Sequence, residues 1–245
     1  MGRLAGKLAL VTGGASGFGA GIAAKFVREG AKVIIADINE PAAETHAATL
    51  GESASWCAMD VSSDSSVAAA VVGLDAPLDI LVNNAGIAQP PLALEQVTEE
   101  DFDRLFAVNM KSVFLTARHI VPLMRQHGGV ILNIASTAGV SPRPGLTWYN
   151  ASKGWLITAT KSMAAELASH NIRVNALNPV AGETPLLATF LGEDTPENRE
   201  RFLATIPLGR FSTPEDLGNA ACFLCSDEAS MITGIAMEVD GGRCI

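Results

Sequence analysis

The chain has 245 residues, of which 48% are hydrophobic and 18% are charged, so it can bury a sizeable core and differs in composition from disordered chains. Its formal net charge of −9 argues against a surface adapted to nucleic-acid phosphates and gives no support for docking on anionic membranes. No apolar run approaches the roughly 20 residues of a bilayer span and the N-terminus lacks a signal-peptide pattern, so we expect one cytoplasmic domain over residues 1–245.

Apolar runs of strand length alternate with helical patterns along the whole chain. We expect strands at residues 7–12, 32–37, 55–60, 79–82, 130–134, 172–177 and 235–239. We expect helices at 19–28, 41–50, near 99–126, at 148–170 and near 214–225. Strands this apolar look buried on both faces. The pattern therefore predicts an α/β fold, a doubly wound parallel sheet covered by helices, with ligands at the carboxyl ends of its strands.

The first strand is followed by a glycine-rich segment, TGGASGFG at residues 12–19. Glycines permit a tight turn and close approach of the backbone to phosphate, and the following helix directs its free N–H groups and positive dipole at the same place. Glycines could simply end a strand and begin a helix. Their position inside a strand–helix–strand unit favours a dinucleotide-binding loop instead.

Asp37 ends the second strand, eighteen residues after Gly19. A carboxylate there can accept hydrogen bonds from the adenosine ribose hydroxyls and would repel a 2′-phosphate. The loop and residues 38–39 contain no Lys or Arg, the cations that NADP binders usually carry. Asp37 could be an ordinary residue at a strand end, but together with the loop it leads us to expect NAD, with NADP less favoured.

Tyr149 is the only tyrosine, and Lys153 follows four residues later, so on a helix both side chains lie on one face. A free phenol has a pKa of about 10, and a nearby ammonium or an oxidised nicotinamide ring favours the phenolate. Such a pair becomes an acid/base near working pH. Ser136 lies thirteen residues upstream, just past a strand. A tyrosine and lysine at this spacing are by chance more often a surface pair, but with Ser136 and the loop they indicate a catalytic site.

One C-x-x-C pair, Cys222 and Cys225, falls within an expected helix, and no histidine lies near it. A metal site would need two more ligands at suitable spacing. We interpret the two cysteines as packed apolar residues and expect no metal site.

Taken together, these motifs resemble the short-chain dehydrogenase/reductase family, in its single-domain subgroup, over essentially the whole chain. Further matching segments are Asp60-Val61, residues 83–86, Asn109, residues 178–184 and residues 239–242. The resemblance implies a Rossmann-type fold, a small-molecule alcohol or ketone substrate, and a homotetramer built through the two long helices and the C-terminal strand. It implies an NAD-dependent oxidoreductase that interconverts a secondary alcohol and a ketone by hydride transfer.

The family's roles carry over to matching positions. Tyr149 is expected to be the general acid/base, Lys153 to bind the nicotinamide ribose, and Ser136 to orient the substrate oxygen. Asn109 completes the catalytic set by holding a water that connects Lys153 to solvent, although it could be a buried asparagine that kinks the helix. The expected cofactor contacts are Gly13, Ser16, Gly17, Phe18, Gly19, Asp37, Ile38, Asp60, Val61, Asn84, Ala85, Gly86, Tyr149, Lys153, Pro179, Gly182 and Thr184. The expected substrate contacts are Ser136, Ala138, Leu146 and Tyr149.

Two features of the later chain concern the substrate. Val180 stands where the family commonly has glycine, and could change the cofactor angle or narrow the pocket. Residues 185–207 carry apolar side chains at roughly helical spacing, which predicts a helical substrate lid or a helix pair packed on the core. A mostly apolar pocket suits a neutral alcohol or ketone, although Arg143 or Arg210 could recognise a carboxylate.

Two other functions remain open at this point. A dinucleotide-sensing regulatory protein would bind NAD or NADP without turnover, but such proteins usually lack the Tyr or Lys that this chain keeps. A sugar-nucleotide epimerase of the longer relatives needs an additional substrate domain, for which a chain of 245 residues has no room.

Overall fold

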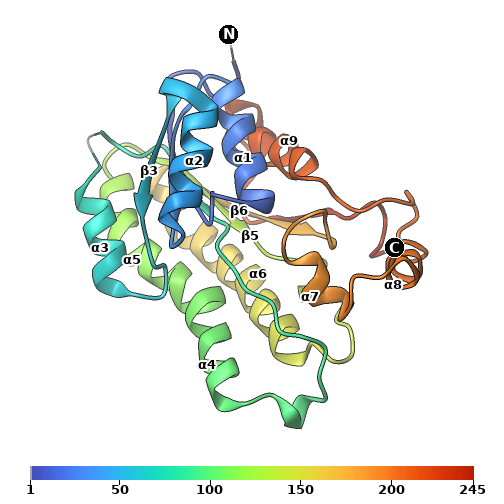
Figure 1. The fold of residues 1–245 in the computed structure, drawn as a ribbon. Helices are drawn as coiled ribbons and strands as arrows, with labels where there is room; N and C mark the ends of the chain where they lie inside the picture. The colour runs from blue at the N-terminus through green and yellow to red at the C-terminus, as the bar shows by residue number, and fades with distance from the viewer. Residues whose placement is uncertain (1, 75) are drawn as a thin grey trace.

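The computed structural model describes residues 2–74 and 76–245. Within these residues a parallel seven-stranded sheet has the order β3-β2-β1-β4-β5-β6-β7 (Figure 1). The strands are β1 Leu8–Thr12, β2 Lys32–Asp37, β3 Ala54–Ala58, β4 Ile80–Asn83, β5 Gly129–Ile134, β6 Ile172–Pro179 and β7 Ala236–Val239. The strand order reverses between β1 and β4. The predicted doubly wound, Rossmann-type sheet is confirmed, and the crevice at this reversal is where such folds bind ligands.

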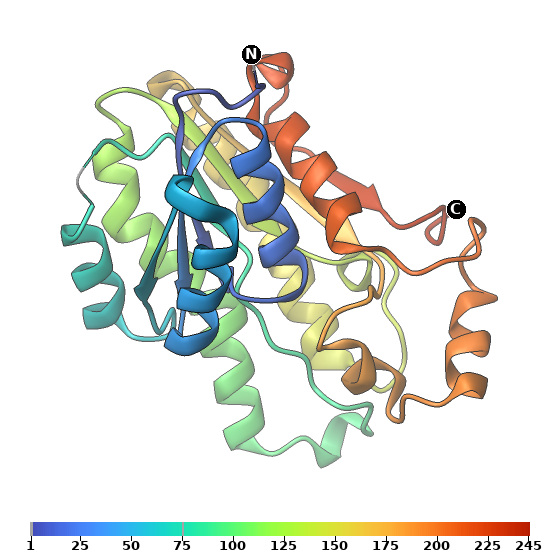
Figure 2. The ribbon, with the colours of Figure 1, turned by 45° about the horizontal axis from the view of Figure 1, so that its top comes forward.

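Helices cover both faces of the sheet. They are α1 Gly17–Arg28, α2 Glu40–Leu50, α3 Asp64–Val72, α4 Glu99–Phe106, α5 Ser112–Met124, α6 Thr147–Leu167, α7 Leu187–Leu191, α8 Pro196–Leu203 and α9 Pro214–Cys225. One buried cluster joins α1, α2 and α9 to the sheet, and a second joins α3, α5 and α6 to its other face. Figure 2 shows α9 lying beside α1, although they are at opposite ends of the chain.

Side chains of the central strands alternate between the two clusters. Ala9 and Val11 of β1 face the α1 side, whereas Leu10 faces the α5 side. The expectation that every strand is buried on both faces is wrong at the sheet edge, because β3 pairs with β2 alone and leaves Ser55 and Trp56 exposed. An edge strand has one neighbour only, so fewer of its side chains are covered.

The long helix expected near residues 99–126 is divided in the structure. A π-helical turn, Ala107–Lys111, separates α4 from α5. It contains Asn109, which is buried. Single π-helical turns inside α-helices occur frequently at functional sites.

Buried side-chain hydrogen bonds tie α5 and α6 to the sheet. The Thr116 hydroxyl of α5 donates to Asn83 Oδ1 at 2.9 Å, and Asn83 Nδ2 donates to Asn133 Oδ1 at 2.9 Å. Asn133 Nδ2 then donates to Thr160 Oγ1 of α6, again at 2.9 Å. An unsatisfied buried polar group costs about 1–3 kcal/mol, so these bonds fix both helices against β4 and β5.

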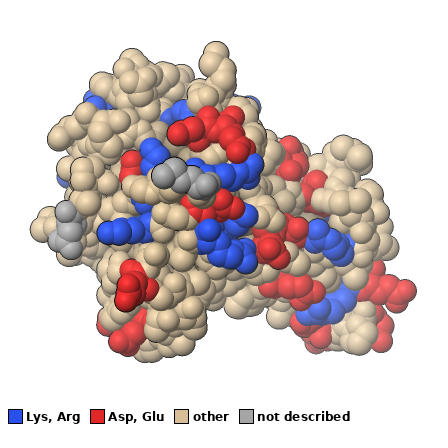
Figure 3. Space-filling model, turned by 90° about the horizontal axis from the view of Figure 1, so that it is seen from above, with Lys and Arg blue, Asp and Glu red and all other residues tan. Residues whose placement is uncertain are grey.

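Figure 3 shows the molecule from above, and on this face positive and negative side chains are mixed. Ion pairs such as Lys25–Glu29, at 2.8 Å, neutralise neighbouring charges.

Among the described residues, no helix combines the length and the apolar character needed to cross a membrane. Cys222 and Cys225 are free thiols buried on α9, and no cluster of three or more potential metal ligands occurs in the described part of the chain.

Candidate active site

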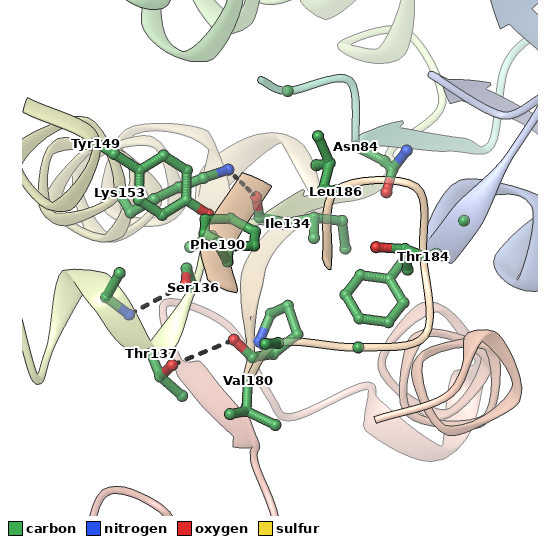
Figure 4. Close-up of a pocket in the computed structure, with 18 of the residues that line it drawn as sticks. Asn84, Ile134, Ser136, Thr137, Tyr149, Lys153, Val180, Thr184, Leu186 and Phe190 are labelled. Atoms are coloured by element: carbon green, nitrogen blue, oxygen red, sulfur yellow. Dashed lines mark hydrogen bonds between the residues drawn. The ribbon is translucent and has the colours of Figure 1, made fainter. Parts of the chain in front are cut away.

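A cavity of about 240 Å³ opens at the carboxyl ends of the central strands (Figure 4). It brings together segments that are far apart in the sequence and that follow β1, β4, β5 and β6. The site residues expected from the sequence that line it are Gly13, Ser16, Gly17, Phe18, Asn84, Ala85, Gly86, Ser136, Ala138, Tyr149, Lys153, Pro179, Gly182 and Thr184. The convergence of these segments places the candidate site at the reversal of strand order.

Other expected site residues lie outside the lining of this cavity. They are Gly19, Asp37, Ile38, Asp60, Val61, Asn109 and Leu146. Leu146 is buried beside Tyr149 and Ala138, so it supports the tyrosine from behind. Asp37 and Ile38 lie at the end of β2, next to the glycine loop, and Ile38 is exposed.

The glycine loop is held from the neighbouring strand. Thr12 Oγ1 accepts hydrogen bonds from the backbone N–H groups of Asn84 at 3.0 Å and Ala85 at 3.1 Å. Asn84 Nδ2 donates to the carbonyl oxygens of Thr12 and Gly13, both at 2.9 Å. At Gly19, a Cβ would lie 2.2 Å from the Gly13 oxygen, so only glycine fits. The Asn84 amide therefore shapes the loop, in addition to any contact it makes with a ligand.

The N-terminus of α1 forms one wall of the cavity. Its N-cap residue, Ser16, makes no side-chain capping hydrogen bond, and Ser16, Gly17 and Phe18 line the cavity. A Cβ on Gly17 would come within 3.3 Å of Thr184, and φ at Gly17 is +54°, so glycine keeps this wall open. Uncapped N–H groups beside a glycine-lined wall fit a pyrophosphate.

Two carboxylates lie at the adenosine end of the expected cofactor path. Asp37 Oδ2 accepts a hydrogen bond from the Ala15 N–H at 3.1 Å, and Oδ1 accepts one from the Asn39 N–H at 3.0 Å. Asp60 Oδ1 accepts from the N–H of Ser62 at 2.9 Å and from its hydroxyl at 2.7 Å. Each carboxylate oxygen has two lone pairs, so both residues keep acceptor capacity for a ligand.

Tyr149, Ser136 and Lys153 converge on one side of the cavity (Figure 4). All three are buried, with exposed fractions of 6%, 9% and 6%. Lys153 Nζ donates to the Ile134 carbonyl oxygen at 2.9 Å and lies 5.8 Å from the centroid of the Tyr149 ring. Their shared burial leaves little contact between bulk solvent and the groups on which acid/base chemistry depends.

Burial also changes the pKa values of this pair. It raises the pKa of Tyr149 to about 12, while the Ser136 hydroxyl and the Arg143 guanidinium act in the opposite direction. Burial lowers the pKa of Lys153 to about 8. The sequence predicts Lys153 as the cation that favours the phenolate, whereas in the structure the cation that lowers the Tyr149 pKa is the guanidinium of Arg143.

Asn109 joins the loop after β4 to α6. Its Oδ1 accepts the Ile87 N–H at 2.9 Å, and its Nδ2 donates to the Ile87 oxygen at 2.9 Å and to Ser152 Oγ at 3.2 Å. A Cβ on Gly86 would approach both Asn109 Oδ1, at 3.4 Å, and Lys153 Nζ, at 3.6 Å. Asn109 is thus part of the framework around Lys153.

Gln89 is a supporting residue that no sequence motif marks. Its Oε1 accepts the Tyr149 N–H at 3.1 Å, and its Nε2 donates to the Gly145 oxygen at 3.3 Å. The N-cap residue of α6, Leu146, provides no side-chain cap, so Gln89 satisfies an open N–H group in the first turn. The contact spans sixty residues of sequence, and only the tertiary fold reveals it.

Val180 and Gly182 follow β6 and face different neighbours. Val180 also lines the cavity, but it is buried in an apolar cluster with Leu187, Phe202, Ile206 and Phe211. A Cβ on Gly182 would lie 2.3 Å from Phe18 Cζ and 2.7 Å from the Ser212 oxygen. The extra bulk of Val180 therefore anchors residues 187–211 against the end of β6.

Comparisons with known proteins match nearly the whole chain. A family model described as enoyl-(acyl carrier protein) reductase matches residues 13–243. The 4-formylbenzenesulfonate dehydrogenase of Comamonas testosteroni is 49% identical over 98% of each chain, and the galactitol 2-dehydrogenase of Agrobacterium fabrum is 39% identical over 98% of each. The crystal structure of a 3-ketoacyl-(acyl-carrier-protein) reductase from Brucella melitensis complexed with NADH has a TM-score of 0.93 and 49% identity, covering 99% of this chain and 100% of that one. The proteins that this chain resembles are oxidoreductases.

Proposed function

The chain belongs to the short-chain dehydrogenase/reductase family, and we propose that within it this protein is an NAD-dependent oxidoreductase that interconverts a secondary alcohol and a ketone. One observation carries the proposal. Tyr149, Ser136 and Lys153 are buried together at a cavity that the uncapped N-terminus of α1 also lines. A proton-transfer group and a cradle for a dinucleotide phosphate therefore share one cavity.

The residues present fit a nicotinamide dinucleotide. The N–H groups at the start of α1 would bind the pyrophosphate, Asp37 the adenosine ribose, and Asp60 and Val61 the adenine. Lys153 would bind the second ribose, and Pro179, Gly182 and Thr184 would surround the carboxamide. When bound, the nicotinamide ring accepts or supplies the hydride.

Asp37 supports NAD as the preferred cofactor. Its carboxylate is held at the rim of the loop by Ala15 and Asn39, where a 2′-phosphate would meet like charge. The similar Brucella reductase is described as a complex with NADH and a similar structure from Beutenbergia cavernae with bound NADP, so the preference for NAD rests on Asp37.

Tyr149 is the proposed general acid/base. In the oxidation direction, its phenolate takes the alcohol proton while the carbon gives up a hydride, and in reduction the phenol returns the proton. Ser136 Oγ holds the substrate oxygen as its charge develops. Arg143 and the Ser136 hydroxyl act against the burial that raises the Tyr149 pKa, and Lys153 is proposed to add positive charge that favours the phenolate.

Residues around this centre complete the proposal. Asn109 is proposed to position Lys153 and to hold the water that connects it to solvent. Ala138 lies beside the reacting oxygen, and Leu146 supports Tyr149. Residues 185–207, which contain α7 and α8, are proposed as the lid of a single domain spanning residues 1–245.

A homotetramer in the cytoplasm is also proposed. The long helices expected at its interfaces carry exposed aromatic side chains, among them Phe102 on α4, Phe114 on α5 and Trp155 on α6. Such an assembly would cover these exposed aromatic side chains.

The names of the relatives leave the substrate open. The compounds named are 4-formylbenzenesulfonate, galactitol and a 3-ketoacyl group on acyl-carrier protein. Each has a hydroxyl or carbonyl group, but their sizes and charges differ. The test follows reduced-nicotinamide absorbance with NAD or NADP and a panel of secondary alcohols, polyols, hydroxy acids and hydroxyacyl esters, together with their carbonyl forms.

Tyr149→Phe is the decisive variant. We expect it to lower turnover by about 10²–10⁴-fold, because it removes the proton-transfer group. Binding of NADH, followed by its fluorescence, should persist. Turnover close to that of the wild type would contradict the role of Tyr149. Tight NADH binding by the wild type with no turnover across the panel would favour the sensing alternative.

A further inference from the structure

Two arginines that no motif includes line the candidate active-site cavity. Arg143 lies between β5 and α6, and Arg243 lies near the C-terminus. The guanidinium carbon of Arg143 is 4.9 Å from the centroid of the Phe202 ring, and that of Arg243 is 5.5 Å from the same centroid. One buried aromatic side chain of α8 therefore holds two positive charges at the cavity.

Among the described residues, Arg143 and Arg243 form no ion pair, whereas Arg199 pairs with Asp194 and Arg210 pairs with Asp216. Asp240, which precedes Arg243 by three residues, uses its carboxylate to accept the N–H groups of Gly242 and Cys244, both at 2.9 Å. Arg210, the other arginine considered as a partner for a substrate carboxylate, is a weaker candidate because its guanidinium already pairs with Asp216.

The backbone that carries Arg143 is also held in place. Asn150 Nδ2 donates to the Arg143 carbonyl oxygen at 2.8 Å, and Asn150 directly follows Tyr149 on α6. The backbone at Arg143 is therefore fixed relative to the reacting phenol. Burial and the charge of Arg243 both lower the pKa of Arg143, as expected for two half-buried cations close to one another.

We propose that the substrate carries an oxyanion, a carboxylate or a sulfonate, which binds between Arg143 and Arg243 while its alcohol or carbonyl carbon lies at Tyr149 and Ser136. Planar guanidinium groups bind such oxyanions through paired hydrogen bonds. Phe190, whose ring centroid is 5.2 Å from that of Tyr149, and Phe202 also line the cavity, so we expect an apolar or aromatic spacer between the two ends of the substrate. This inference rests on the proposed oxidoreductase function and names its substrate class.

The net charge of −9 does not oppose this assignment. At physiological ionic strength, exposed charges act over about 8 Å, so a substrate inside the cavity responds to the two nearby arginines. The preference for an anion should then weaken only moderately with added salt, because both guanidinium groups are partly buried.

The test compares an acid with its amide. The substrate pair is 4-(1-hydroxyethyl)benzoate and 4-(1-hydroxyethyl)benzamide, which have similar shape and differ in charge. We expect kcat/KM to favour the acid by on the order of 100-fold in the wild type, the effect of charge-assisted hydrogen bonds in a partly buried site. Arg143→Met and Arg243→Met should each reduce this ratio at least tenfold. Using the ratio cancels any effect of Arg143 on the Tyr149 proton.

Arg201→Met is the matched control. Arg201 lies on α8 next to Phe202, but it is exposed and lies outside the cavity lining, so its removal should leave the ratio unchanged. Equal kcat/KM for acid and amide in the wild type, or a ratio that survives in both cavity variants, would overturn the proposal.

A binding measurement separates this inference from the proposed function. The non-reacting probes 4-methylbenzoate and 4-methylbenzamide are titrated by calorimetry into the full chain with NADH added. Tighter binding of the benzoate that disappears in Arg143→Met and Arg243→Met supports the anion site even if no alcohol turns over. Turnover of several neutral alcohols with equal binding of the two probes would remove the anion site and keep the oxidoreductase.

Discussion

The positive charge of Lys153 is buried at a free-energy cost to the folded state. Removing this charge should therefore make the cofactor-free protein more stable. The side chain is 6% exposed, and burial lowers its pKa from 10.5 to about 8. At about 1.36 kcal/mol for each pKa unit, the protonated amine destabilises the folded protein at pH 7 by about 3 kcal/mol relative to the unfolded chain. Lys153→Met removes this cost and also the hydrogen bond to the Ile134 oxygen, whose loss costs about 1 kcal/mol. We expect a net gain of about 2 kcal/mol.

The gain should depend on pH with a defined sign. Because the folded-state pKa lies below the unfolded value, the proton on Lys153 opposes folding in full below about pH 8. The penalty declines between pH 8 and 10.5, where the lysine of the unfolded chain also becomes neutral. The advantage of the methionine variant should therefore shrink over this interval, and near pH 10 the lost hydrogen bond should make the two proteins about equal.

The assay is urea unfolding of the protein freed of nucleotide, followed by tryptophan fluorescence at pH 7, 8, 9 and 10. Lys161→Met is the control, because Lys161 is exposed on the same helix, and a surface substitution should change the free energy of unfolding by less than about 0.5 kcal/mol. A Lys153→Met protein that is less stable than the wild type at pH 7, or an advantage that does not shrink with rising pH, would refute the reasoning.

Two further predictions concern the cofactor loop and the packing of α6. Asp37→Ser should lower the ratio of kcat/KM for NAD over NADP by on the order of tenfold or more, because it removes the charge that repels a 2′-phosphate, and an unchanged ratio in the absorbance assay would contradict this role. Gly154→Ala should stabilise the protein by about 0.5–1 kcal/mol, because the nearest atom to its added Cβ, the Gly139 oxygen, is 3.6 Å away and alanine favours a helix interior. Gly139→Ala, on the other side of the same contact, should destabilise it by about 1–3 kcal/mol, because its Cβ would lie 2.8 Å from the Lys153 carbonyl carbon; urea unfolding in which both variants moved in the same direction would refute this packing.

Strands and helices with a clear pattern in their own residues were predicted correctly from the sequence. The segment at 32–37 is a strand at its predicted limits, because consecutive β-branched residues leave little alternative, and the helix at 214–225 begins at its proline and ends as expected. Strand β6 extends to Pro179, beyond the predicted residue 177, because its last residues pair with β7. The π-helical turn was missed, since its extra residue is hidden within an otherwise continuous helical pattern.

The candidate site also has some parts that short sequence motifs predict and other parts that only the tertiary fold reveals. The glycine loop and the Tyr149–Lys153 pair are short motifs, and the structure places both at the cavity. Gln89 and Arg243 act on residues distant in sequence, so no spacing rule could include them. Because it is an arginine, Arg143 could be proposed from the sequence as a partner for a substrate carboxylate. Its position beside Phe202, however, depends on how α8 packs.

The π-helical turn at Ala107–Lys111 also bears on how this site can be gained or lost in evolution. Such a turn holds one residue more than the α-helical turn that would replace it. Deleting a single codon within residues 107–111 would restore an unbroken α-helix, with α4 and α5 keeping the faces they bury, and would remove only the bulge that presents Asn109. The position of Asn109 next to Gly86, close to Lys153, can thus arise or disappear through one insertion or deletion, without any redesign of the helices on either side.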